Sequence, residues 1–200
     1  MHDLIRKYSL ATLVTLSADG LNANHIPLHI AAGLSLYGTL KGHVARSNAM
    51  WKDFASNVDV LAIFQGPEAY ISPSWYATKV DTGKVVPTWN YAVVHAYGRL
   101  EIHEDPLWIR EQMESLTQEK EGNFHHPWSV SDAPQDFTEK LIGAVVGIEI
   151  PITKLLGKWK VSQNQPVQNR HGVIEGLQGM QNNPGYMMAD LVKLEGSDAD

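Results

Sequence analysis

The most regular pattern in the chain is an alternation of small apolar and large amphipathic residues over positions 89–103. One face carries small apolar residues, namely Ala92, Val94, Ala96, Gly98, Leu100 and Ile102. The other face carries larger residues, namely Trp89, Tyr91, Val93, His95, Tyr97 and Arg99. A period of two predicts a long β-strand. The small face suits the tight interior of a β-barrel, and the large face suits a subunit interface or a ligand wall.

Other strand-like runs follow one another with turn signals between most of them. Residues 10–16 and 21–30 flank a turn signal at 17–20, which predicts a hairpin. Further strands are expected at 33–40, 58–64, 69–72, 145–150 and 158–161, with a turn at 65–67. Parallel strands would need a helix between most of them. About seven mostly sequential strands therefore predict an antiparallel barrel with peripheral helices, in the mainly β or α+β class.

Helices are predicted around these strands. Asp105 supplies an N-cap and Pro106 a favourable first position, so a helix should run to about Glu121. Shorter helices are expected at 48–54 (capped by Ser47 or Asn48), 134–142, 167–180 and 184–192, an irregular loop at 73–87, and a frayed acidic end at 195–200. We therefore predict a barrel domain over residues 1–166, and a short C-terminal helical extension over 167–200 packed on that same domain.

Composition excludes several classes of protein. The chain has 200 residues and no cysteine, which excludes disulfides, thiolate catalysis and cysteine-ligated metals. No apolar run approaches the roughly 20 residues that cross a bilayer, and the N-terminus has no apolar stretch of signal-peptide type. A cytoplasmic protein without a membrane segment is expected. The net charge is −6 and the basic residues are scattered, so direct DNA binding is doubtful.

The densest group of hydrogen-bonding side chains lies at residues 157–166, where a strand-like alternation ends. Lys160 supplies a charge there, and Ser162, Gln163 and Asn164 supply directional donors and acceptors beside Trp159. This set suits a flat, polar, anionic ligand. A solvated loop rich in turn-forming residues is the alternative.

Residues 42–48 form a second candidate, because they leave a strand and enter a predicted helix. Backbone N–H groups at a helix N-terminus, together with Arg46 and Ser47 or Asn48, would make a phosphate cradle. Ordinary capping with a solvated arginine is the alternative. No metal site is expected, since His25 and His29 would lie about 13 Å apart on one strand, at roughly 3.3 Å per residue.

Six stretches together resemble the PaiB-type family of FMN-binding negative transcriptional regulators. They are residues 11–15, 24–28, 42–48, 69–76, 86–91 and 160–164, and the resemblance spans about residues 8–180. It implies an FMN-binding split β-barrel similar to pyridoxamine-phosphate-oxidase-like proteins, which dimerise and bind flavin at the subunit interface. Family members usually carry a short segment with a Tyr-x-Pro signature before the first hairpin, whereas this sequence starts almost at the first predicted helix.

The resemblance implies FMN as the cofactor and a homodimer with the cofactor site at its interface. It assigns the flavin phosphate to Arg46 with Ser47 or Asn48. The resemblance places Lys160, Ser162, Gln163 and Asn164 near the ring or ribityl chain, from the neighbouring subunit. It places Asn24, His25 and Pro27 on the strand flanking the isoalloxazine, and Trp89 and Asn90 where they close the site. His43 completes the expected cofactor-binding set.

Several functions stay open. The first is a regulatory protein whose interactions depend on FMN. The alternative is an FMN-dependent oxidoreductase acting on a small substrate, in which the flavin carries the redox chemistry. In that enzyme His25, His43 and His95 could relay protons, but no residue is assigned a catalytic role. A haem-binding barrel with an axial histidine is the third possibility.

Overall fold

The computed structural model describes residues 1–32 and 35–194, and within them the strands form one antiparallel barrel-like sheet. The sheet has eight strands in the order β2-β1-β5-β6-β8-β4-β3, with β7 paired to β8. The strands are β1 (Leu10–Ser17), β2 (Gly20–Pro27), β3 (His29–Ala31), β4 (Thr39–Ala45), β5 (Val60–Ile71), β6 (Thr88–Gly98), β7 (Glu101–His103) and β8 (Val145–Lys160). The registered ladders are antiparallel. The predicted antiparallel barrel with helices is confirmed.

Most of the helices lie where the sequence predicted them. They are α1 (His2–Lys7), α2 (Lys79–Thr82), α3 (Pro106–Glu121), α4 (Gln135–Gly143), α5 (Val167–Gly179) and α6 (Asn183–Leu194), with single 3-10 turns η1 (Ala49–Trp51), η2 (Pro73–Trp75) and η3 (Val130–Asp132). The Asp105 carboxylate accepts a hydrogen bond of 3.0 Å from the backbone N–H of Leu107. The predicted cap of α3 is therefore confirmed.

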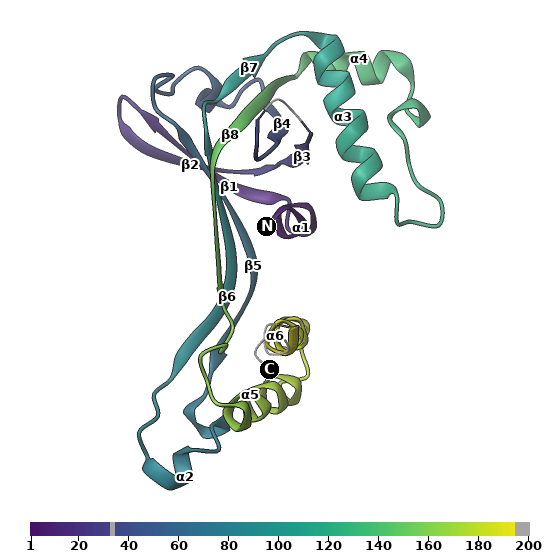
Figure 1. Ribbon diagram of the computed structural model, residues 1–200. Coiled ribbons are helices and arrows are strands. Elements are labelled where there is room, and N and C mark those ends of the chain that lie inside the picture. Colours follow the sequence, from purple (N-terminus) through teal and green to yellow (C-terminus); the bar gives the residue numbers. More distant parts are fainter. Residues whose placement is uncertain (33–34, 195–200) are drawn as a thin grey trace. The chain divides into compact units, whose positions relative to one another are not determined.

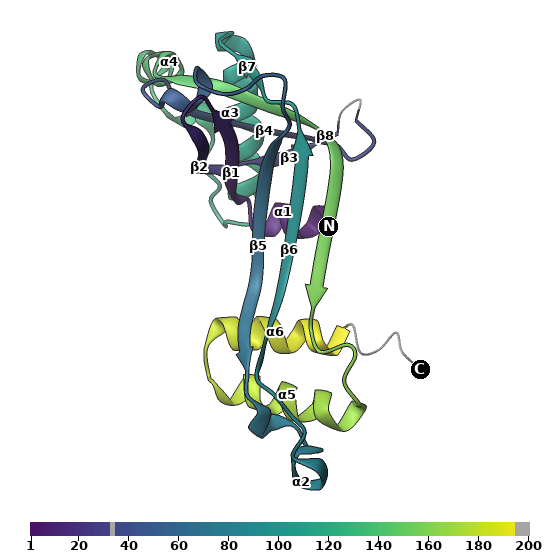
Figure 2. The ribbon, with the colours of Figure 1, turned by 90° about the vertical axis from the view of Figure 1, so that its left-hand side faces the viewer.

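The chain divides into two compact units. The barrel unit comprises Met1–Phe64 and Val94–Leu156, and the helical unit comprises Gln65–Val93 and Gly157–Asp200. In the barrel unit, α3 contacts both β4 and α4 (Figure 1). In the helical unit, α5 and α6 lie side by side (Figure 2). The predicted domain boundary at residue 166 stays a prediction.

The alternation of β6 is confirmed. Ala92, Val94 and Ala96 are fully buried, while the residues between them are partly exposed. Gly98 ends the strand against β8: a Cβ atom there would lie 2.2 Å from the carbonyl oxygen of Pro151. The small face of β6 therefore permits the close approach of backbones that a narrow barrel requires.

The core of the helical unit is built by α5, α6 and the ends of strands. It consists of nine buried residues, namely Ala69, Ile71, Tyr76, Val161, Val173, Leu177, Met188, Ala189 and Val192. Two glycines bring α5 against η2: a Cβ atom on Gly172 would lie 1.9 Å from the carbonyl oxygen of Trp75, and one on Gly176 would lie 2.2 Å from its indole ring. This close contact between α5 and η2 fixes the position of the chain segment that follows η2.

Two predicted interruptions of strands are wrong. The predicted turn at residues 65–67 does not form, because β5 runs through it. The ladder between β1 and β5 covers residues 61–63, so Pro67 lies beyond it, where a missing N–H breaks no bond of that ladder. The predicted strands at 145–150 and 158–161 are likewise one strand, β8.

Other boundaries differ from the prediction. The strand expected at 21–30 is divided at Leu28, whose N–H donates to the carbonyl of Ser9, and the strand expected at 89–103 is divided into β6 and β7. The strand expected at 33–40 begins only at Thr39, after Gly38 with φ of +85°. The helix expected at 48–54 is only η1, and residues 73–87 contain η2 and α2. Positions 33–34 and 195–200 of the predictions lie outside the described residues.

Candidate functional site

In the barrel unit, Asn24 contacts Asn48, which lies two positions after Arg46. The side-chain amide of Asn48 donates to Oδ1 of Asn24 at 2.8 Å, and its own Oδ1 caps η1 by accepting from the N–H of Met50 at 3.0 Å. The indole N–H of Trp51 donates to the carbonyl of Arg46 at 3.0 Å, and the guanidinium lies 5.8 Å from that ring. These contacts bring Asn24, which was predicted to flank the ring, against Asn48, which was predicted to lie at the phosphate together with Arg46.

The guanidinium of Arg46 is anchored by its own chain. Its Nε donates to the carbonyl of Gly143 at 3.0 Å, and one Nη donates to that of Val145 at 3.1 Å. The other Nη donates to Glu104 at 2.6 Å. Three of the five N–H donors of the fork are thus in use. The side chain is 39% exposed, so the fork has a fixed orientation and two further donors.

The other predicted residues of the barrel unit are dispersed. Ser47, His25 and Pro27 are exposed. Successive side chains of a strand point to opposite faces, so His25 and Pro27 lie on the face of β2 opposite to Asn24. The prediction that all three flank one ring therefore needs both faces of β2.

His43 belongs to a different, more buried group. Its Nδ1 lies 2.7 Å from Oε1 of Gln112, and Nε2 of Gln112 lies 3.5 Å from Nδ1 of His29. An amide oxygen only accepts, so Nδ1 of His43 is the donor in this hydrogen bond. Burial lowers the pKa of His29 below its usual value. This row of polar groups couples α3 to β3 and β4.

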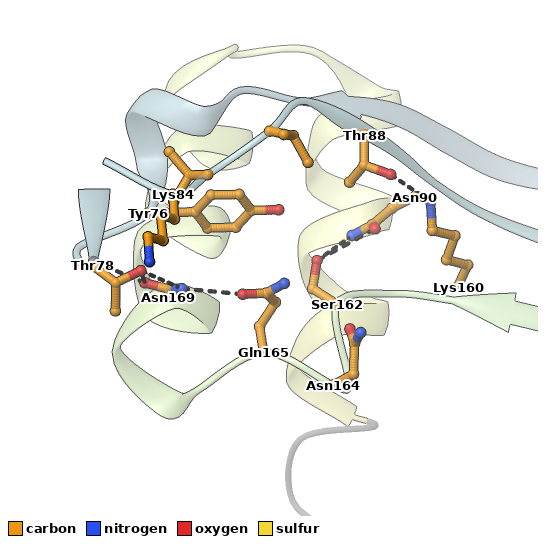
Figure 3. Close-up of a pocket in the computed structure, with 12 residues that line it drawn as sticks. Tyr76, Thr78, Lys84, Thr88, Asn90, Lys160, Ser162, Asn164, Gln165 and Asn169 are labelled. Carbon is orange, nitrogen blue, oxygen red and sulfur yellow. Dashed lines mark hydrogen bonds between the residues drawn. The ribbon is translucent and has the colours of Figure 1, made fainter. Parts of the chain in front are cut away.

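In the helical unit, four of the predicted residues share a cavity of about 270 Å³ (Figure 3). Its lining residues are Tyr76, Thr78, Lys84, Val85, Val86, Thr88, Asn90, Lys160, Ser162, Asn164, Gln165 and Asn169. They come from the loops around α2, the start of β6, the end of β8, the loop between β8 and α5, and the first turn of α5. The predicted members are Asn90, Lys160, Ser162 and Asn164.

Hydrogen bonds join the buried polar residues of this cavity. The amide of Asn90 donates to the Ser162 hydroxyl at 2.9 Å, and Lys160 donates to the hydroxyl of Thr88. Asn169 accepts from the backbone N–H of Thr78 at 3.1 Å and donates to its hydroxyl at 3.0 Å. Such a network holds the polar wall in one arrangement.

Two predicted residues of the helical unit lie outside the cavity lining. The Gln163 side chain turns back onto the strand end, since it accepts from the N–H of Val161 at 2.8 Å and donates to the carbonyl of Trp159 at 2.6 Å. Trp89 is 54% exposed and contacts the edge of Tyr70. Lys160 lines the cavity, whereas Gln163 does not, and the contacts of both residues with the flavin stay predictions.

The sequence interpretation missed Tyr76, Thr78, Lys84 and Asn169. The available signal was Asn169, because asparagine is unfavourable within a helix and yet stands inside the predicted helix at 167–180. It is 3% exposed and bonds Thr78 across the cavity. A buried asparagine in a helix implies a partner outside that helix.

A second polar cluster lies on β7 and β8. Ligand atoms of Glu101, His103 and Glu149 lie within 4.8 Å of one another, which is close enough to share a metal ion. However, the ammonium of Lys41 lies 3.7 Å from Glu149 and compensates its charge, and the His103 ring stacks on Trp108 at 4.1 Å. We read this cluster as an ion-pair network. None of the described helices combines the length and apolar character needed to span a membrane.

Comparison with known proteins places the chain in a family. Residues 1–154 match the sequence model of a family described as "Putative FMN-binding domain". The chain is 34% identical over 231 residues to an uncharacterized protein of Emericella nidulans, covering 98% of this chain and 92% of that protein. It is 31% identical over 191 residues to the Protease synthase and sporulation protein PAI 2 of Bacillus subtilis, covering 96% of this chain and 89% of that protein.

Solved structures agree in fold at low sequence identity. The FAD and Heme binding protein of Mycobacterium smegmatis has a TM-score of 0.55 at 12% identity, covering 79% of this chain and 68% of that chain. The conserved hypothetical protein Rv2991 of Mycobacterium tuberculosis has a TM-score of 0.54 at 14% identity, covering 82% and 86%. The chain thus belongs to the "Putative FMN-binding domain" family, as a PaiB-type split-barrel protein with FMN as its cofactor.

Proposed function

We propose that the protein is a cytoplasmic, homodimeric regulatory protein whose interactions depend on FMN held at the subunit interface. The observation that carries the placement of the cofactor is the contact between Asn24 and Asn48 beside Arg46. Residues predicted for one cofactor from separate stretches of sequence lie against one another there. Arg46, Ser47 and Asn48 would hold the phosphate, and Asn24 would lie beside them; His25 and Pro27, on the opposite face of β2, would meet the ring only from the other side of that strand.

The donor set of this cluster fits a phosphate. A guanidinium whose orientation is fixed in advance loses little conformational freedom when it binds, and its planar fork matches phosphate oxygens. Two of its N–H donors are not engaged by Gly143, Val145 or Glu104. Ser47 is exposed beside it and offers a hydroxyl. Glu104 disfavours phosphate binding, because its carboxylate already accepts a hydrogen bond from one side of the guanidinium fork.

The proposed dimer is supported by the large face of β6. Tyr91, His95 and Tyr97 are only half-buried in the single chain. Aromatic residues that combine an apolar body with a polar end are enriched at interfaces. Bound FMN would supply the redox chemistry, and the residues of this chain would bind and orient it.

The regulatory role is supported by the similarity to PAI 2, whose name is Protease synthase and sporulation protein. The net charge of −6 disfavours a broad contact with nucleic acid. We therefore place the regulatory output in contacts with a protein partner, with direct DNA binding excluded from the proposal.

Flavin titration tests this proposal. FMN should bind with quenched flavin fluorescence, and Arg46→Ala should weaken FMN at least ten-fold while leaving riboflavin, which lacks the phosphate, almost unchanged. Equal losses for both flavins would remove Arg46 from the phosphate. Sedimentation should give a dimer. Stoichiometric turnover of NAD(P)H with a small substrate would indicate the oxidoreductase instead.

A further inference from the structure

The cavity of the helical unit has a built polar wall. Asn90, Ser162 and Asn169 are only 1%, 5% and 3% exposed. Burying amides and hydroxyls costs free energy unless they are hydrogen-bonded, and each of these side chains has a partner within the helical unit. Their positions are therefore set before any ligand arrives, which reduces the entropy lost on binding.

The charges at this cavity are of one sign. Lys84 and Lys160 lie on opposite sides of it (Figure 3), and none of its lining residues is acidic. The ion pairs found within residues 1–32 and 35–194 do not include either lysine. Thr88 holds the ammonium of Lys160, which keeps two of its three donors for a ligand. An anion would thus meet two uncompensated positive charges.

The backbone at Ser162 is also unusual. Its φ is +61°, a conformation that residues other than glycine rarely adopt. The bond to Asn90 holds this conformation and directs the hydroxyl toward the cavity. Strained residues that the surroundings hold in place cluster at ligand-binding sites. Burial raises the pKa of Tyr76, so its hydroxyl remains protonated at neutral pH and can donate.

We infer that this cavity binds a small organic anion other than the flavin, carrying a carboxylate or phosphate group between Lys84 and Lys160. The amides of Asn164 and Gln165 would contact its polar body, and Val85 and Val86 its apolar part. The volume of about 270 Å³ lies below the roughly 300–1,000 Å³ of sites for drug-sized ligands, which favours a ligand smaller than a flavin nucleotide. Contacts with this anion replace the flavin contacts that the resemblance implies for Asn90, Lys160, Ser162 and Asn164. The ligand would act as an effector or a substrate of the FMN-loaded protein.

Calorimetric titration of the protein, with and without added FMN, tests this inference, with inorganic phosphate and citrate as separate probes at low ionic strength. At least one should bind with a stoichiometry of one per chain, and the pair distinguishes a phosphate site from a carboxylate site. Lys160→Gln and Lys84→Gln should each weaken that anion about ten-fold. Lys158→Gln is the matched control, because Lys158 is exposed and lies outside the lining.

The possible outcomes are separable. If neither probe binds saturably, or if Lys158→Gln weakens binding as much as Lys160→Gln, the inference is wrong. If Lys160→Gln weakens FMN as much as the anion, the cavity belongs to the flavin site instead. Failure of FMN to bind at Arg46 would leave the anion result unaffected. Circular dichroism melting of each variant shows whether a loss reflects unfolding.

Discussion

The protein presents basic side chains in two regions, and these differ in what already surrounds the charge. In the barrel unit, Arg46 binds two backbone carbonyls and Glu104. In the helical unit, Lys84 and Lys160 line a cavity without an acidic lining residue. A positive charge in a motif is therefore not the same as a charge available to an anion. The anchored guanidinium of Arg46 is fixed in orientation. The two lysines are not neutralised by an acidic lining residue, so they keep more of their electrostatic attraction for an anionic ligand.

The largest expected effect tests whether the packing of α5 holds the helical unit together. Leu177→Ala removes a fully buried side chain from the core of that unit. The free energy of unfolding should fall by about 2–5 kcal/mol, from lost burial and the remaining cavity. Urea denaturation followed by circular dichroism measures it. Leu156→Ala, at a side chain that is 46% exposed, is the control, and an equal effect for both would refute this account of the core.

A smaller effect tests the contact between α5 and η2. Gly172→Ala would place a methyl group 1.9 Å from the carbonyl oxygen of Trp75, so we expect a loss of about 1–3 kcal/mol. Gly179 lies in the same helix and has nothing within 4 Å of an added Cβ atom. Gly179→Ala should therefore be neutral or slightly stabilising. Thermal melting of both variants measures these changes in stability. An unchanged stability of Gly172→Ala would mean that α5 can move away from η2 at no cost, against this prediction.

The counter-charge of Arg46 offers a way to sharpen the comparison between the two regions. Glu104→Gln removes the carboxylate that competes with a phosphate for the fork. FMN should then bind about two- to five-fold more tightly, as expected from an exposed ion pair of roughly 0.2–1 kcal/mol. Fluorescence titration measures the change, with Glu101→Gln as the control. Weaker binding would instead mean that Glu104 is needed to orient Arg46.

The last expected effect concerns pH and the barrel unit. Burial lowers the pKa of His29, so as pH falls the unfolded chain takes up a proton before the folded protein does. Stability should be complete above about pH 6.5 and should decrease below it, by at most about 1.4 kcal/mol per pH unit. Urea denaturation between pH 7.5 and 5 measures the slope. His29→Gln should reduce it, and the exposed His171→Gln should not; equal slopes in all three proteins would contradict the assignment.

The sequence predicted the parts of the fold that depend on local pattern. The alternation of β6 and the cap of α3 carry unambiguous local signals, and both were confirmed. The turn expected at residues 65–67 failed because a proline can stand in an extended strand where no ladder bond is required. Local sequence does not reveal where a ladder ends.

The candidate sites were predictable only in part. The segment at 157–166 was recognised as chemically rich, and Lys160 and Ser162 do line a cavity. The opposite wall, with Tyr76 and Asn169, depends on the packing of α5 against η2, which no short motif encodes. Likewise, the carbonyls that anchor Arg46 come from residues about 100 positions away, and backbone acceptors leave no trace in side-chain patterns.

The most direct test of the difference between the two regions is a pair of FMN dissociation constants, for Arg46→Ala and Lys160→Gln, each compared with riboflavin. We expect Arg46→Ala to weaken FMN binding at least ten-fold with riboflavin binding unchanged, and Lys160→Gln to change the affinity of neither flavin. A loss of FMN affinity in Lys160→Gln, with Arg46→Ala unaffected, would contradict this expectation and place the flavin phosphate in the helical unit.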